Sequence, residues 1–197
     1  IAARAHVESH IALLGGATVR NNLRFRLHGE RAEGLINGVY LPHHHQHMDN
    51  HVLITHAAPD CNSRQFFKGI LSDASRSVFT GRIIVDPVAQ KTNAEQSCQN
   101  LLLSDDARAH VQPQLEIFAD DVRCTHGTTT GQLDDDAMFY LRSRGVEEAT
   151  ARGLLLWAFA HEVLDRMSVA GLRAKLEHAL LARLPQAAEL QSMLEGA

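Results

Sequence analysis

Short apolar segments alternate with polar positions from residue 1 to about residue 126. Gly, Asp, Asn and Pro interrupt these segments, and no helical stripe of any length occurs among them. Alternation with a period of two is typical of strands that bury one face. The pattern therefore predicts β-structure, with the strongest strands at residues 18–27, 34–41, 51–56, 64–71, 77–85, 98–103 and 113–118.

A weak internal repeat runs through these strands. Leu71, Val85, Leu103 and Phe118 each follow an apolar residue and precede a small or acidic corner, at steps of roughly 14 to 18 residues. The corners are too short to hold the crossover helices of an α/β sheet. An antiparallel sandwich and a β-solenoid both remain open, and the repeat favours stacked solenoid rungs.

The period changes to that of a helix after residue 133. Asp134 is placed as an N-cap, further acidic residues occupy the first turn, and Arg142 lies near the end of the segment. Gly145 is placed as the stop residue. The sequence therefore divides into a β core at residues 1–132 and a helical region at residues 133–197.

Two more helices are predicted in this region, at 146–167 and from about Val169 to Leu184, where Pro185 follows. The apolar content between Leu154 and Phe159 exceeds what one buried face requires. Either the second helix packs on its neighbour and on the solenoid, or it keeps a face for another protein.

Composition excludes several classes of protein. The 197 residues include 19 basic and 23 acidic ones, interspersed, so no basic face for nucleic acid is expected. No apolar run approaches the roughly 20 residues of a membrane span. Three cysteines argue for a reducing compartment, and we expect a cytoplasmic protein. Because the chain begins with Ile1, we expect a fragment or a processed product.

Cys124 and His126 are the first candidate for chemistry. Both lie at the end of a predicted strand, two positions apart, so their side chains leave the same face with Cα atoms roughly 6–7 Å apart. Thiolate and imidazole suit iron, zinc and iron–sulfur clusters. Two ligands do not close a four-coordinate site, however, and spacing alone also fits a buried cysteine beside a hydrogen-bonded histidine.

A run of histidines at residues 43–51 is the second candidate. His45, His47 and His51 have the alternating spacing of a one-faced ladder on a strand, which could bind a divalent ion. Pro42 precedes the run, and an exposed polar corner explains it equally well. Phosphate-binding and serine-hydrolase motifs are absent.

Four strings carry a resemblance to a known family: "AQKT" (89–92), "NLLLSDDA" (100–107), "PQLEIFADDV" (113–122) and "FYLRSRG" (139–145). With them, the chain closely resembles the SufB/SufD family of iron–sulfur cluster assembly proteins. The glycine after His126 and the "FYLRSRG" string are more similar to the SufD branch than to the SufB branch.

The resemblance implies a mainly β fold, a right-handed parallel β-helix followed by a C-terminal helical region. It further implies a non-catalytic scaffold in a SufBCD-type complex, with a SufC-like ATPase docked on the C-terminal helices. Cys124 and His126 match the family's Cys-x-His position, where the histidine helps to hold a transient iron–sulfur cluster at the interface with a SufB-like paralogue, or with a second copy in a homodimer. Cys61 and Cys98 match no family ligand.

Two other functions stay open at this point. The chain could be a metal-dependent β-solenoid enzyme that uses the histidine run at residues 43–51. It could also be a purely structural assembly protein in which Cys124 and His126 are inert.

Overall fold

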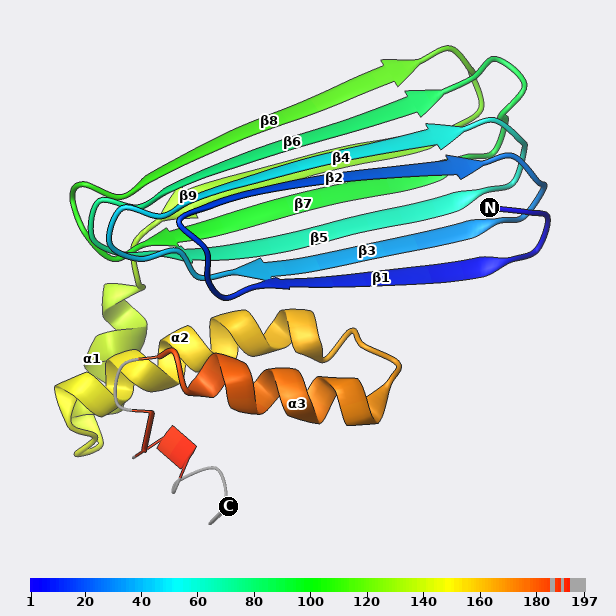
Figure 1. Ribbon diagram of the computed structural model, residues 1–197. Helices are drawn as coiled ribbons and strands as arrows, with labels where there is room; N and C mark the ends of the chain where they lie inside the picture. Colours follow the sequence, from blue (N-terminus) through cyan, green and yellow to red (C-terminus); the bar gives the residue numbers. More distant parts are fainter. Residues whose placement is uncertain (185–186, 189, 192–197) are drawn as a thin grey trace.

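A computed structural model describes residues 1–184, 187–188 and 190–191. Within these residues the chain forms strands up to residue 131 and helices after it (Figure 1). The strands are β1 (His6–Leu13), β2 (Thr18–Leu27), β3 (Glu33–Tyr40), β4 (His47–His56), β5 (Asn62–Leu71), β6 (Arg76–Val85), β7 (Asn93–Leu102), β8 (Arg108–Ile117) and β9 (Arg123–Gly131). The helices are α1 (Asp135–Ser143), α2 (Glu148–Leu164) and α3 (Ala170–Leu181).

The strands form two parallel sheets that face each other. One sheet has the order β1-β3-β5-β7-β9 and the other the order β2-β4-β6-β8, so the chain changes sheet at every corner (Figure 1). Glu33 pairs with Asn62, and Asn62 pairs with Asn93. Each strand thus hydrogen-bonds to the strand two places along the chain, and the predicted parallel solenoid is confirmed, with about four turns.

The predicted repeat of 14 to 18 residues is half of one turn. Leu71 ends β5 in one sheet, and Val85 ends β6 in the other. The sequence pattern is the same in both sheets because each strand buries one face against the shared interior. A complete turn is therefore twice as long as the apparent repeat, and the first strand, β1, was not among the predicted ones.

Corner residues repeat with the turn. Arg31, Asp60 and Lys91 have positive φ angles of 57°, 58° and 57°, although none of them is glycine. The backbone N–H of Asp60 donates to the carbonyl of Gln90, one turn further on, at 2.9 Å. Hydrogen bonds between stacked corners offset the cost of about 1–2 kcal/mol that a left-handed residue carries.

Helix α1 has the predicted ends. The Asp134 side chain accepts hydrogen bonds from the backbone N–H groups of Asp136 and Ala137, at 2.8 and 3.2 Å. Gly145 follows the C-cap with a φ of +86°. Both ends of the helix were readable from local sequence because capping uses neighbouring residues.

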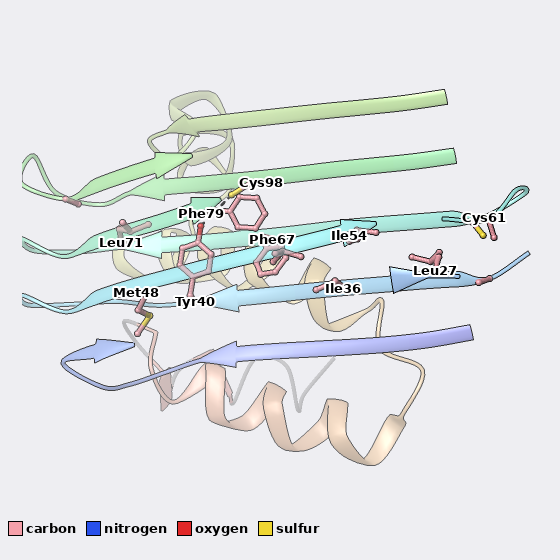
Figure 2. Close-up of a cluster of buried hydrophobic side chains, with 14 residues drawn as sticks. Leu27, Ile36, Tyr40, Met48, Ile54, Cys61, Phe67, Leu71, Phe79 and Cys98 are labelled. Atoms are coloured by element: carbon pink, nitrogen blue, oxygen red, sulfur yellow. Dashed lines mark hydrogen bonds between the residues drawn. The ribbon is translucent and has the colours of Figure 1, made fainter. Parts of the chain in front are cut away.

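The interior of the solenoid contains apolar clusters between the two sheets, together with some buried polar side chains. Figure 2 shows aromatic and aliphatic side chains from both sheets gathered in the interior between them. Phe67 of β5 and Phe79 of β6 are completely buried, with ring centroids 4.7 Å apart. Gly38 of β3 leaves the space that the Phe67 ring occupies, since a Cβ there would lie 2.2 Å from that ring.

A second core lies between the outer face of the five-stranded sheet and the helices. Phe66 and Ile70 of β5 pack with Leu156 and Val163 of α2, so α2 covers the outside of the solenoid (Figure 1). Lys68 lies in the same layer and forms an ion pair with Glu162.

The apolar excess between Leu154 and Phe159 has an intramolecular explanation. Leu156 is fully buried, whereas Leu154, Trp157 and Phe159 are partly buried against the same cluster. The predicted packing on the solenoid and the neighbouring helix is therefore confirmed, while these three side chains remain partly exposed. Pro185, the predicted stop of the third helix, lies outside the described residues. None of the helices described has the length and apolar character needed to cross a membrane.

Candidate functional site at the open end of the solenoid

Cys124 and His126 are the second and fourth residues of β9. They begin the strand, which continues to Gly131, rather than end it as the sequence suggested. β9 is the outermost strand of its sheet and pairs with β7. Both candidate ligands therefore lie on an edge strand at the last turn of the solenoid.

The strand register and the alternation of side chains along the strand place both side chains on the inward face of β9. Cys124 pairs with Ala94 and His126 with Gln96, and both partners are buried. Cys124 is partly buried against a small cluster that includes Ile83. His126 is exposed because, within the described chain, the facing sheet ends at β8 and leaves this part of β9 uncovered.

The two groups differ in readiness to bind a metal ion. Burial raises the pKa of the Cys124 thiol, and the backbone N–H of Ala94 opposes that shift only in part. The thiol is therefore protonated at neutral pH and becomes a ligand only when a metal ion displaces its proton. The exposed imidazole of His126 is open to a partner or a metal ion without rearrangement of the core.

The other two cysteines are enclosed in the interior. Cys61 donates a hydrogen bond to the carbonyl of Gly29 at 3.2 Å. Cys98 lies 3.6 Å from the Tyr40 hydroxyl, and burial raises the pKa of its thiol to about 11. Buried protonated thiols act as small apolar residues, which agrees with their lack of an assigned role.

The described part of the chain holds no group of three or more His, Cys, Asp or Glu residues placed to bind a metal ion. Cys124 and His126 supply two donors, whereas zinc and cluster iron need four ligands. As a metal site the pair would be a half-site, which needs further donors from outside the described residues.

The histidine run does not assemble a metal site. His44 lies in the exposed corner, where its ring contacts Asp73 at 3.2 Å, and His45 is exposed beside it. His47 and His51 are on the outer face of β4, where His51 contacts Asp49 at 2.8 Å. The run is thus divided between a corner and a strand face, and the predicted ladder does not include His45.

Sequence reasoning missed the polar residues inside the solenoid. Gln65 and Gln96 are each 1% exposed, and His56 is completely buried with its Nε2 atom 2.8 Å from the Ser63 hydroxyl. Their alternation with apolar neighbours was a usable signal, because a polar residue at an inward position of a strand is unusual.

The sequence profile of the family described as "SUF system FeS cluster assembly, SufBD core domain" matches residues 1–159, which include all nine strands and the half-site. The chain belongs to the SufBD family. The matched residues cover the whole of the parallel solenoid.

Relatives of this SufBD chain occur in bacteria and plants. It is 41% identical over 177 residues to the iron–sulfur cluster assembly protein SufD of Escherichia coli, a match that covers 90% of this chain and 42% of the relative. A SufBD family protein of Synechocystis is 38% identical, with 86% and 38% covered. Protein ABCI7, chloroplastic, of Arabidopsis thaliana is 34% identical, with 83% and 35% covered. The chain spans about two fifths of the length of these relatives.

Proposed function

We propose that this chain is a SufD-like, non-catalytic scaffold subunit of a SufBCD-type complex. The observation that carries the proposal is a thiol and an imidazole on the inward face of an edge strand, with two of four ligands present. Family membership supplies iron–sulfur cluster assembly as the process. The nascent cluster is the cargo, and Cys124 and His126 hold one side of it.

The open end of the solenoid supports an interface with a SufB-like paralogue. β8 and β9 end the two sheets, so their outer edges have unpaired backbone groups available to another chain. Ile117 and Phe118 are 40% and 60% exposed at the end of β8. A partner that pairs with these edges would cover the apolar residues and bring its own ligands to His126. Two copies of this chain would form the equivalent homodimer.

Helix α1 is the surface that best fits a SufC-like ATPase. Phe139 and Tyr140 are 73% and 55% exposed, whereas the apolar residues of the cluster on α2 are buried or partly buried against the solenoid. Next to Phe139 lies a hollow of about 720 Å³ between α1 and the corner at Leu103. Exposed aromatic side chains beside a hollow are typical of the energetic centre of a protein interface.

The assembly role is tested by replacing His126. Anaerobic reconstitution with iron and sulfide, in the presence of a SufB-type partner, is expected to give visible cluster absorbance. We expect His126→Ala to reduce this absorbance at least tenfold, because losing one ligand leaves the cluster open to solvent and exchange. Absorbance spectra and bound-iron assays measure the effect.

His110→Ala is the matched control, because His110 is an exposed histidine on the neighbouring strand β8 with its side chain on the outer face. It should keep the absorbance of the unmodified chain. Equal absorbance in His126→Ala and in the unmodified chain would remove His126 from the cluster site.

The ATPase surface is tested by Phe139→Ala. We expect the dissociation constant for a SufC-type ATPase to rise about tenfold or more, since an exposed aromatic anchor at an interface contributes at least about 1–2 kcal/mol. Titration calorimetry measures it. Leu172→Ala on α3 is the control, because Leu172 is 42% exposed on a different helix. Equal weakening by both variants, or none by either, would place the ATPase elsewhere.

A further inference from the structure

A column of polar side chains lies directly next to His126 in the interior. The strand register aligns Gln65 of β5 with Gln96 of β7, and Gln96 with His126 of β9. All three residues belong to the inward face of their strands. The last apolar member of the column is Ile36 of β3.

Neither glutamine amide has a hydrogen-bond partner among the described residues, although both are 1% exposed. Burying an unpaired amide costs roughly 1–3 kcal/mol, so such groups are rare in folded proteins. An apolar side chain of the same length would fit the strand pattern without that cost. Two of them in one column, next to a candidate ligand, require an explanation other than stability.

The opposite sheet makes room for the Gln96 amide. Gly81 of β6 faces it across the interior, and a Cβ at this position would lie 2.4 Å from Gln96 Nε2. The Gln96 side chain therefore extends across the interior toward a position that carries no side chain. The backbone of Gln96 pairs with that of His126 on β9, at the usual strand spacing of about 4.8 Å.

The chemistry of imidazole suggests a role for the Gln96 amide as a hydrogen-bond acceptor. A neutral imidazole has one N–H donor and one acceptor nitrogen, and the hydrogen bond made by one nitrogen decides which of the two keeps a lone pair for a metal ion. Histidine ligands are commonly oriented in this way by a carbonyl or carboxylate. The amide oxygen of Gln96 is a buried acceptor on the residue that pairs with His126.

We propose that Gln96 is a positioning residue for His126, and that it fixes the tautomer and the ring orientation of the imidazole through a hydrogen bond from a ring N–H to the amide oxygen. The bond forms when a partner covers the open end, because the imidazole then loses contact with water and the Gln96 amide gains its missing partner. The inference rests on the proposed function of His126 as a cluster ligand.

Gln96→Met tests the inference, and Gln65→Met is its matched control. Both substitutions remove an unpartnered amide at equal burial, so both variants should fold at least as stably as the unmodified chain. The histidine ring tautomer is read from ¹⁵N NMR of the complex with a SufB-type partner, and affinity is measured with iron(II) alone. Gln96→Met is expected to give mixed tautomers of His126 and 10- to 100-fold weaker iron(II) binding. Gln65→Met should change neither, since it is two strands from His126.

Gly81→Ala is a second variant that keeps Gln96. Its Cβ displaces the flexible amide end, so it should reproduce the mixed tautomers. An unchanged tautomer in Gln96→Met, or an equal change in Gln65→Met, would overturn the inference. If His126→Ala keeps full cluster absorbance, the proposed function fails instead, and the tautomer still reports on the Gln96 hydrogen bond by itself.

Discussion

Gly38→Ala is expected to lower the free energy of unfolding by about 3 kcal/mol, at the upper end of the usual cost of overpacking. The added Cβ would lie 2.2 and 2.3 Å from two atoms of the Phe67 ring. That ring is completely buried and packs against Phe79 on the facing sheet. It cannot move without disturbing both sheets, so the backbone has to shift instead. Urea denaturation followed by circular dichroism measures the change.

Two further variants separate the ring clash from a general effect of replacing glycine. Gly127→Ala also adds a methyl group to a strand, but no atom lies within 4 Å of the new Cβ, so its stability should stay within about 0.5 kcal/mol of the unmodified chain. Phe67→Leu combined with Gly38→Ala should cost less than the sum of the single changes, because the smaller side chain yields space. Additive costs would show that the clash is not the cause.

Because of His56, the free energy of unfolding is expected to fall by about 3 kcal/mol as the pH is lowered from 6.5 to 4. Burial lowers the pKa of its imidazole from 6.5 to about 4. Above pH 6.5 the residue is neutral in both states and contributes no pH dependence. Below pH 6.5 the His56 imidazole binds a proton in the unfolded chain, whereas in the folded chain it stays neutral down to about pH 4. The unfolded state is therefore stabilised relative to the folded state by about 1.4 kcal/mol for each pH unit.

The control is His56→Gln, which does not titrate and keeps a polar group near Ser63, the hydrogen-bond partner of His56. Urea unfolding at a series of pH values should give a shallower slope for the variant between pH 6.5 and pH 4. Other histidines, such as His6, whose pKa is raised by hydrogen bonds to Glu8 and Glu33, titrate equally in both proteins. Identical slopes would mean that His56 is not buried in its neutral form.

The local sequence pattern was sufficient to predict individual strands and helices. The strand at Thr18–Leu27 has the bounds that alternation predicted, and Asp134 and Gly145 mark the ends of α1 as expected. Each of these features depends on residues within a few positions of one another. The period of the repeat was less informative, because the two sheets carry the same pattern and a half turn cannot be told from a full turn.

The surroundings of Cys124 and His126 depended on contacts between residues that are distant in the sequence. Cys124 was expected at a strand end and lies near a strand start, where its side chain meets the cluster around Ile83. The alignment of His126 with Gln96 follows from the pairing of β7 with β9, about 30 residues apart in the chain. No local pattern contains that register.

The sequence by itself determined the parallel β-solenoid, the helical region after it, and the Cys-x-His position. Alternation, capping and family motifs all depend on residues that are close together in the sequence. They can therefore be recognised without knowing which distant residues are in contact. Only the tertiary structure decided that His126 lies at an uncovered end of the described chain, that the Gln96 amide has no hydrogen-bond partner among the described residues, and that α2 packs on the solenoid. The exposure and the hydrogen bonds of a residue depend on its neighbours in space. In this fold those neighbours lie about one full turn of the solenoid away in the sequence.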